Sequence, residues 1–290
     1  MTSQLDPNAL AAWCRIPAEA LETHPDRKIP LVIVDQPADV HQWAGRAMAD
    51  EVKANNAAGN PTRWILACGP TGQYRAFTEI VNREQISLAN VLVFHMDEYL
   101  DWQGRPVPPE HSFNLRTTMD HIFYEPVDST LRVPLEQRFY PSVYDIDRIS
   151  ADIERVGGID TMYGGIGYRG HLAFNEPPHA PWNTVTAKQF RNSKTRILPI
   201  SVDSIIARSV RDVGGLSHMV PPMAITLGMK DLLAARRIRL LVETGEWKQA
   251  VIRVLLFGPE TTEYPVTFVQ SHQDVRLVID RRSAGAPLGA

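Results

Sequence analysis

Residues 159–177 read IDTMYGGIGYRGHLAFNEP, a short apolar run that ends in a glycine-rich turn, followed by a histidine and a glutamate. Three other runs share this design: TRWILACGPTG at 62–72, VLVFHMDEYL at 91–100 and IRLLVETGEWK at 238–248. The runs are continuous rather than alternating, which is typical of strands that helices cover on both faces. The pattern therefore predicts an α/β fold around a parallel sheet.

Helical patterns separate these runs along the chain. Residues 38–56 carry apolar side chains at helical spacing behind a first strand at 29–35, and a second helix is expected at 73–83. A further amphipathic helix follows residue 248, and VRLVID at 275–280 is expected to be the last strand. This alternation predicts a three-layer sandwich around a mostly parallel sheet.

No shift in composition marks a domain boundary, so residues 29–282 are expected to form a single domain. Residues 1–28 contain prolines and no clear pattern, which predicts an N-terminal arm or a short helix packed on the body. The small residues of 283–290 predict a flexible tail. The polar, proline-rich insert at 100–116 has the length of loops that often act as lids or binding loops.

The composition narrows the class of protein. The chain has 290 residues, 44% of them apolar, and a net charge of −3, which allows a sizeable core and disfavours a nucleic-acid binder with its basic face. Two distant cysteines and the spacing of the histidines offer no disulfide or metal framework. The N-terminus lacks a signal-peptide pattern, and no apolar run approaches the roughly 20 residues of a membrane span. We therefore expect a cytoplasmic protein with no membrane or nucleic-acid partner.

The turns that follow the apolar runs are the candidate site, because ligands in open α/β sheets bind beyond the carboxyl ends of the strands. CGPTG at 68–72 precedes a helix and offers backbone N–H groups to an oxyanion, although an ordinary strand-to-helix turn would look the same. Asp97 and Glu98 follow a buried run, where loss of water raises a carboxyl pKa and suits a general base. A helix cap or a salt bridge is the alternative for this pair.

His171 and Glu176 lie five residues apart in the glycine-rich segment, so a turn can bring them together. A carboxylate beside an imidazole fixes the tautomer of the ring and holds it for acid–base work. A structural histidine is the alternative.

MDEY at 96–99, together with GGIG and GHLAFNEP within 164–177, resembles the glucosamine-6-phosphate deaminase (isomerase) family. The resemblance extends from about residue 29 to about residue 279 and includes PTG at 70–72, ITLG at 225–228 and the turn at 245–248. That family shares a modified Rossmann-like fold with the 6-phosphogluconolactonases and, more distantly, ribose-5-phosphate isomerase. The resemblance implies the same fold here.

The resemblance also implies roles for single residues. Asp97 would move a proton between C2 and C1 of an open-chain sugar, and His171, oriented by Glu176, would assist ring opening. The residues assigned to substrate binding are Thr71, Gly72, Gln73, Gly165, Arg208 and Lys248. The implied partner is a small sugar phosphate, and no metal or organic cofactor is expected. Family members occur as monomers and hexamers, so a homo-oligomer stays open.

The chain departs from the family pattern at three places. Arg169 stands where the family has an aspartate, and we count it among the catalytic residues because a guanidinium there is expected to lower the His171 pKa or to bind a negative group of a different substrate. Residues 73–75, Gln-Tyr-Arg, replace a small residue and Thr-Pro, which predicts an altered anion pocket. A family arginine aligns with Val210, so Arg208 or Arg211 is expected to bind the phosphate instead.

Three hypotheses follow. The first is isomerisation, with or without deamination, of a phosphorylated amino sugar that resembles glucosamine 6-phosphate. The second is a non-catalytic sugar-phosphate sensor or an isomerase of a different sugar phosphate, for which Arg169 is the motive. The third is a hydrolase of the 6-phosphogluconolactonase type, which the FNEP sequence at 174–177 disfavours.

Overall fold

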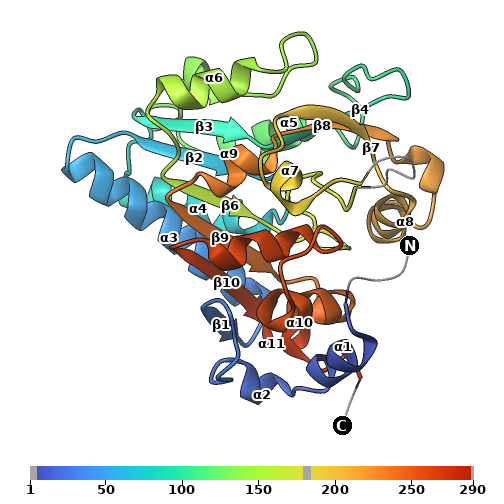
Figure 1. Cartoon of the computed structure of the whole chain (residues 1–290). Helices are drawn as coiled ribbons and strands as arrows, with labels where there is room; N and C mark the ends of the chain where they lie inside the picture. The colour runs from blue at the N-terminus through green and yellow to red at the C-terminus, as the bar shows by residue number, and fades with distance from the viewer. Residues whose placement is uncertain (1–4, 179–183, 289–290) are drawn as a thin grey trace.

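A computed structural model describes residues 5–178 and 184–288 of the chain. Its main sheet has the strand order β1-β10-β9-β6-β2-β3-β5, and every neighbouring pair is parallel (Figure 1). These strands are β1 Leu31–Val34, β2 Thr62–Leu66, β3 Val91–His95, β5 Arg138–Phe139, β6 Thr161–Gly164, β9 Arg237–Val242 and β10 Val275–Asp280. The strands expected from the apolar runs are confirmed.

Helices cover both faces of this sheet. Helices α3 (Pro37–Ala57) and α4 (Gly72–Glu84) pack on one face, whereas α6 (Arg148–Arg155), α9 (Met229–Leu233) and α10 (Gln249–Phe257) pack on the other (Figure 1). The remaining helical segments are α1 Pro7–Cys14, α2 Ala18–Leu21, α5 Leu115–Met119, η1 Asp120–Tyr124, η2 Leu135–Gln137, α7 Ala187–Arg191, α8 Val202–Asp212, η3 Ser217–Met219, η4 Glu246–Lys248, η5 Pro265–Ser271 and α11 Arg281–Ala284. The predicted three-layer α/β sandwich is confirmed.

Strand β2 shows why its sequence has no polar alternation. Trp64 and Leu66 pack into the core beneath α3 and α4, while Ile65, on the opposite face, packs into the core beneath α10. All three side chains are fully buried. Because successive side chains of a strand point to opposite faces, a strand covered on both sides must be apolar at every position.

A second, smaller sheet was not expected from the sequence. It is antiparallel, in the order β4-β8-β7, and consists of β4 (Asp97–Leu100), β8 (Met223–Thr226) and β7 (Arg196–Pro199). The polar turn expected after the buried run at 91–96 is instead strand β4, which leaves the main sheet. Tyr99 then packs in a separate small core. The two acids at the start of β4 suggested a turn, and the four residues DEYL do not by themselves indicate a second sheet.

The N-terminal segment is packed on the body as helices α1 and α2, which agrees with the helical alternative and not with a free arm. The guanidinium of Arg253, a fully buried residue of α10, joins this segment to the other end of the chain. Its Nη2 donates to the backbone carbonyls of Ile16, Ala284 and Gly285 at 2.8, 2.7 and 3.1 Å. Residues 1–4, which belong to the predicted arm, lie outside the described residues.

The prediction of a flexible tail from residue 283 is wrong for the described part of that segment. Ser283 and Ala284 are fully buried in α11, and the Leu288 N–H donates to the Cys14 carbonyl at 3.3 Å. The small side chains that suggested flexibility instead let the backbone approach α10 and α1 closely. The last two residues of the predicted tail, 289–290, lie outside the described residues.

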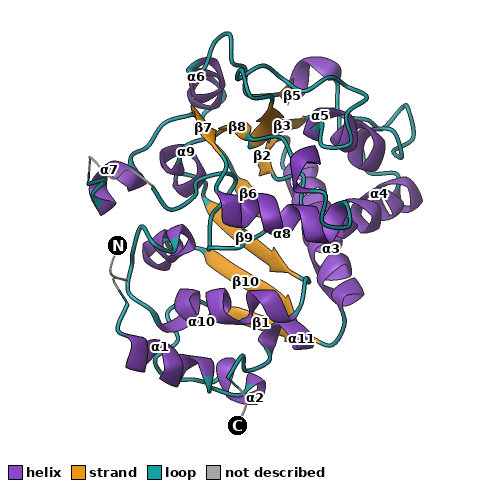
Figure 2. Cartoon of the chain, turned by 90° about the vertical axis from the view of Figure 1, so that its right-hand side faces the viewer, coloured by secondary structure: helices purple, strands orange, loops and turns teal. Residues whose placement is uncertain are grey.

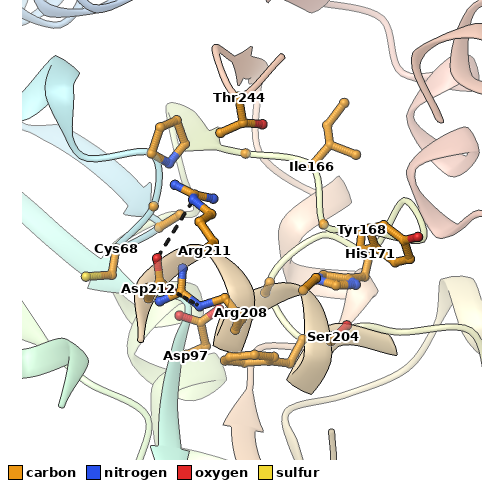
Figure 3. Close-up of a pocket in the computed structure, with 18 of the residues that line it drawn as sticks. Cys68, Asp97, Ile166, Tyr168, His171, Ser204, Arg208, Arg211, Asp212 and Thr244 are labelled. Atoms are coloured by element: carbon orange, nitrogen blue, oxygen red, sulfur yellow. Dashed lines mark ion pairs between the residues drawn. The ribbon is translucent and has the colours of Figure 1, made fainter. Parts of the chain in front are cut away.

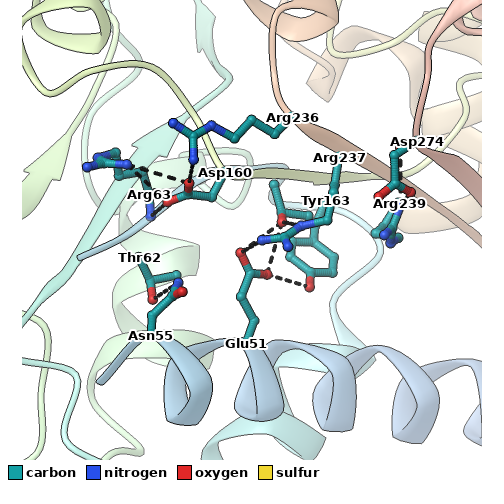
Figure 4. Close-up of polar contacts among 11 residues, drawn as sticks. Glu51, Asn55, Thr62, Arg63, Asp160, Tyr163, Arg236, Arg237, Arg239 and Asp274 are labelled. Atoms are coloured by element: carbon teal, nitrogen blue, oxygen red, sulfur yellow. Dashed lines mark hydrogen bonds and ion pairs between the residues drawn. The ribbon is translucent and has the colours of Figure 1, made fainter. Parts of the chain in front are cut away.

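Polar contacts fasten the amino-terminal edge of the main sheet to α3 (Figure 4). The carboxylate of Glu51 on α3 accepts hydrogen bonds from Thr161 Oγ1 at 2.8 Å, Tyr163 Oη at 3.1 Å and Arg237 Nη2 at 2.6 Å. Thr161 and Arg237 are the first residues of β6 and β9. Because this network occupies the amino-terminal edge, the opposite edge of the sheet is left for a ligand.

Neither a membrane-spanning helix nor a metal-binding cluster is present in the described part of the chain. None of its helices combines the length and the apolar character that a membrane span requires. Within residues 5–178 and 184–288, no group of three histidine, cysteine or acidic side chains is placed to hold a metal ion.

Candidate active site

A cavity of about 350 Å³ lies at the carboxyl-terminal edge of the main sheet. The four turns singled out in the sequence all contribute to its lining, with residues 68–71, Asp97, residues 165–168 with His171, and residues 243–244 with 247–248 among them. Helix α8, which crosses in front of the sheet in Figure 2, and part of the proline-rich insert complete the lining. The structure thus brings together segments that are more than 100 residues apart in the sequence.

Asp97 is the first residue of β4 and lines the cavity. Burial, and then the neighbouring charge of Glu98, raises the pKa of this carboxyl to about 7, while Arg208 acts in the opposite direction. Among the described residues, no side chain forms a hydrogen bond or an ion pair with the Asp97 carboxylate. A carboxylate that is unpartnered and titrates near neutrality is suited to take and return a proton.

Glu98 has a different environment from its neighbour. Its carboxylate accepts hydrogen bonds from the backbone N–H groups of Tyr99, Leu115 and Arg116 at 2.9, 2.8 and 2.9 Å. Leu115 and Arg116 begin α5, so Glu98 caps this helix. The helix-cap alternative raised for the acidic pair therefore holds for Glu98, and Asp97 remains free for the cavity.

His171 also lines the cavity, and its Nδ1 lies 3.7 Å from Glu176 Oε1. This separation exceeds hydrogen-bond distance, and neither atom has a hydrogen-bond partner among the described residues. The other oxygen of Glu176 accepts from the Ser201 N–H at 2.5 Å. Burial, and then the charge of Lys248, lowers the His171 pKa to about 3, so the imidazole is neutral.

The glycine at position 167 determines where the His171 ring can lie. A Cβ atom at this position would be 1.8 Å from His171 Nε2, which is far inside contact distance. The Gly167 N–H also donates to the His171 carbonyl at 2.8 Å and closes the turn. The imidazole occupies the space that a side chain at position 167 would fill, which explains the glycine there.

The ITLG segment holds the loop that carries Glu176. Thr226 Oγ1 accepts from the Phe174 N–H at 3.1 Å, and the side-chain amide of Asn175 donates to the Leu227 carbonyl at 2.8 Å. Both contacts are buried, so the loop is fixed in position by the antiparallel sheet.

A second group of lining residues surrounds Lys248. Its Nζ donates to the Ile166 carbonyl and lies 4.0 Å from the centroid of the Trp247 ring. Burial, and then the charge of Arg211, lowers the Lys248 pKa to about 7. Thr71 lines the same cavity at the N-terminus of α4, and its side chain forms no capping hydrogen bond.

Gly165 connects the two loops at this end of the cavity. A Cβ atom there would lie 3.0 Å from Pro70 Cδ and 3.1 Å from the Gly69 carbonyl oxygen. The backbone of the PTG loop therefore packs directly against the backbone of the glycine-rich turn, and only a residue without a side chain allows this approach.

Two residues assigned to substrate binding do not line the cavity. A Cβ at Gly72 would lie 2.3 Å from His41 Nδ1, so this position faces α3. Gln73 is buried, and its Nε2 donates to the Pro70 carbonyl at 2.5 Å. Both residues begin α4, where the helix directs the Gln73 side chain, and any side chain at position 72, towards the protein interior. Neither residue therefore lines the cavity as the sequence-based assignment expected.

Residues 73–75, from which an altered anion pocket was expected, do not line the cavity. Tyr74 is fully buried and donates its hydroxyl hydrogen to the Ala67 carbonyl. Arg75 lies on the outer face of α4, where it pairs with Glu79 at 3.0 Å. These departures from the family therefore serve packing and the surface rather than the cavity.

Helix α8 contributes a cluster of charged side chains to the cavity (Figure 3). Asp212 Oδ2 lies 2.9 Å from Arg208 Nε, and Asp212 Oδ1 lies 3.8 Å from Arg211 Nε. The sequence suggested both arginines, but Asp212 and Ser204 were missed. They belong to no motif, and only their spacing from the arginines along one helix face could have indicated them.

Arg169 does not line the cavity, although the sequence suggested a catalytic role. Its Nη1 lies 3.3 Å from Asp203 Oδ2 on α8, and the two side chains are 42% and 48% exposed. The expected direction of the His171 pKa is right, but the cause is wrong, because burial and Lys248 lower it. The side chain turns outwards from the glycine-rich loop, a direction that its position in the sequence could not reveal.

Replacement of Arg169 by glutamine is expected to change the pH dependence of catalysis very little, because Arg169 does not set the protonation of His171. An exposed ion pair contributes about 0–1 kcal/mol, so the free energy of unfolding should fall by no more than that. Denaturant unfolding and a pH–rate profile test this expectation, with Asp203→Asn as the matched variant. A shift of either limb of the profile by one pH unit would contradict it.

Known proteins with similar sequences point to one family. A glucosamine-6-phosphate deaminase of Porphyromonas gingivalis is 30% identical over 241 residues, which cover 82% of this chain and 86% of that protein. A glucosamine-6-phosphate deaminase of Phocaeicola vulgatus is 29% identical over 247 residues, with the same coverage of each chain. No protein-family profile matches the chain.

Solved structures share the fold. A monomeric glucosamine-6-phosphate deaminase superposes with a TM-score of 0.75 at 24% identity and covers 88% of this chain and 99% of its own. A 6-phosphogluconolactonase from Shewanella baltica gives a TM-score of 0.60 at 16% identity, with coverage of 86% and 96%. The architecture and the sequence similarity over most of both proteins lead to one conclusion: the chain belongs to the glucosamine-6-phosphate deaminase family.

Proposed function

We propose that this chain isomerises and deaminates a phosphorylated amino sugar, with glucosamine 6-phosphate as the first candidate. The observation that carries the proposal is the pairing, in one cavity, of an unpartnered carboxylate, Asp97, with a neutral imidazole, His171, and a buried cation, Lys248. Aldose–ketose chemistry requires a base over C1 and C2, a proton carrier at the ring oxygen and an anchor for the anion.

Substrate binding begins at the lysine. Lys248 and Thr71 would hold the phosphate, with the backbone of Gly165 against the sugar. The low pKa of the lysine means that the free site titrates near neutrality, and a bound phosphate dianion would favour the charged ammonium. The anchored phosphate then places the opposite end of the sugar at Asp97.

Ring opening is the step assigned to His171. The neutral ring accepts the proton of the C1 hydroxyl at Nε2 and returns it to the ring oxygen as the C1–O5 bond breaks. Glu176, next to Nδ1, favours the tautomer that carries its proton on Nδ1 and leaves Nε2 free to accept. A short movement of either side chain would convert the 3.7 Å separation into a hydrogen bond.

Isomerisation is the step assigned to Asp97. The carboxylate takes the C2 proton, the C2–H electrons form the C1–C2 double bond, and O1 becomes an oxyanion. The nitrogen lone pair then drives the return of the proton from Asp97 to C1, which leaves an iminium at C2. Addition of water to that iminium releases ammonia and gives the 2-ketose phosphate.

The test is an NMR assay with glucosamine 6-phosphate in D2O that follows ammonia, fructose 6-phosphate and the C2 proton signal. The proposal expects release of ammonia, with deuterium at C1 of the product in the fraction of turnovers in which the proton on Asp97 exchanges with solvent before its return. Glucose 6-phosphate is the control substrate, because it can be isomerised but contains no nitrogen. Thermal stabilisation by the sugar phosphates without turnover would favour a sensor instead, and hydrolysis of 6-phosphogluconolactone alone would favour the lactonase.

A further inference from the structure

The two arginines that α8 directs into the cavity lie in different surroundings. The guanidinium of Arg208 lies 5.6 Å from the ring centroid of Phe113, in the loop before α5. The guanidinium of Arg211 lies 5.9 Å from the ring centroid of Trp247, and the Lys248 ammonium contacts the same ring. Arg208 and Arg211 therefore have different neighbours: Arg208 lies near the loop before α5, and Arg211 lies near Trp247 and Lys248.

Figure 3 shows the same division. Arg208 lies beside Asp97, whereas Arg211 extends towards Thr244, on the turn that leads to Lys248. Phe113 in turn packs edge-on against Tyr99, two residues after Asp97, with ring centroids 5.5 Å apart. Arg208 is thus connected through Phe113 and Tyr99 to β4, the strand that carries the proposed base.

Asp212 forms an ion pair with both side chains. Its carboxylate lies 2.9 Å from Arg208 Nε and 3.8 Å from Arg211 Nε. A guanidinium has five N–H donors, so each arginine keeps N–H groups for a ligand in the cavity. What each arginine donates to therefore depends on the part of the cavity that it faces.

We propose that Arg208 is a catalytic residue that donates hydrogen bonds to O1 of the open-chain sugar, while Arg211 binds the phosphate together with Lys248. This inference rests on the proposed function. It revises the expectation that either arginine could bind the phosphate, because Arg208 lies on the Asp97 side of Asp212 and Arg211 on the Trp247 side.

The charge of Arg208 matches the step at which O1 becomes negative. When Asp97 takes the C2 proton, the electron pair of the C1–O1 double bond moves to O1, and a preoriented guanidinium stabilises that oxyanion. The proton later returns from Asp97 to C1, so the arginine neither gains nor loses a proton. The same positive charge disfavours an ammonium at C2 and selects the substrate whose amine is neutral and able to donate its lone pair.

Arg208 also acts on the base itself. Burial and Glu98 raise the Asp97 pKa, and Arg208 offsets part of that rise. Loss of the guanidinium should therefore move the acid limb of the pH–rate profile to higher pH, because the carboxylate would ionise later. Loss of Arg211, which acts on Lys248, should leave that limb in place.

The experiment compares Arg208→Gln with Arg211→Gln, each the control for the other on the same helix. Arg208→Gln is expected to lower kcat by about 100-fold, as removal of an oxyanion donor does, with the Kd of inorganic phosphate within twofold of the parent. Arg211→Gln is expected to weaken phosphate binding by at least about tenfold, the usual effect of a lost charge-assisted contact. Phosphate binding is measured by 31P NMR titration and kcat by ammonia release.

Two readouts do not require turnover, so failure of this inference differs from failure of the proposed function. Phosphate affinity and the Asp97 pKa, followed by NMR of the labelled carboxyl, are measured on the resting protein. If no amino sugar phosphate reacts but Arg208→Gln raises the Asp97 pKa and spares phosphate binding, the division of the arginines stands and only the reaction is wrong. Equal losses of phosphate affinity in the two variants would overturn the inference.

The variant Arg208→Lys distinguishes a loss of charge from a general disturbance of the fold. It keeps the charge but loses the planar fork, and it should hold the Asp97 pKa near that of the parent while kcat remains low. An Asp97 pKa in Arg208→Lys that equals the one in Arg208→Gln would argue against an electrostatic role.

Discussion

Replacement of Asp97 by asparagine is expected to lower kcat on glucosamine 6-phosphate by about 1,000-fold, within the usual contribution of a positioned acid–base group. The amide has nearly the shape of the carboxylate but cannot take the C2 proton. The loss should appear equally in deuterium exchange at C2 and in ammonia release, because both depend on the same proton transfer. Binding of inorganic phosphate should be unchanged, since the proposed phosphate ligands, Lys248, Thr71 and Arg211, do not include this residue.

The same variant should be more stable than the parent at alkaline pH. Because the Asp97 pKa is about 7 in the folded protein and about 4 in an unfolded chain, the folded state keeps a proton that the unfolded chain has lost across that range. The parent therefore loses stability as the pH rises from about 4 to about 7, and asparagine does not. The gain in the free energy of unfolding should be on the order of 2 kcal/mol at pH 8, after allowance for water in the cavity.

Unfolding temperatures at pH 4.5, 6 and 8 measure this effect. Glu98→Gln is not a suitable control, because it removes the cap of α5, so the comparison is with the parent at each pH. A difference between variant and parent that is constant over the three pH values would show that the Asp97 pKa is near its ordinary value. Turnover by Asp97→Asn at the parental rate would exclude this residue as the base.

Replacement of Gly167 by alanine is expected to cost at least about 100-fold in kcat/KM, because the added methyl group would overlap the His171 ring and displace it. A displacement of about 1 Å in a reacting group is enough for a loss of that size. The φ angle of Gly167 is not in the left-handed region, so alanine fits the backbone and the variant should fold. The effect is therefore on the position of the imidazole.

The double variant Gly167→Ala with His171→Ala supplies the control. Once the ring is gone, the methyl group at position 167 has space, so the double variant should be no less active than His171→Ala alone. Such non-additivity is the signature of two residues that act through one contact. Independent, multiplicative losses would show that the alanine at 167 disturbs the turn and not the histidine.

The sequence predicted those features that depend on burial and on strand ends. Continuous apolar runs such as 62–66 can only be strands covered on both faces, and their polar continuations must then meet at one edge of the sheet. Asp97 and His171 were found in this way, because the motif lies directly after a strand. The resemblance supplied the chemistry that the pattern alone left open.

The features that were missed depend on where a side chain points. The acids at 97–98 indicated the end of a strand, but nothing in DEYL shows that these residues pair with a second sheet. Arg169 precedes His171 by two residues, yet the turn directs it to Asp203 on the outside. Gln73 and Tyr74 begin a helix, whose rotation about its axis decides which residues face the cavity, and sequence position does not determine that rotation in advance.

Hydrogen bonds from the buried Arg253 side chain link the N-terminal segment to the C-terminal segment. Its charge is removed from water, and three backbone carbonyls from residues 16, 284 and 285 are the acceptors that compensate for the loss. A shortened chain that lacks either segment would remove one or two of these three acceptors, at a cost of about 1–3 kcal/mol for a buried donor left unsatisfied. Trimming for crystallisation, or a protease cut near residue 16, would therefore affect the whole domain and not merely a loose end.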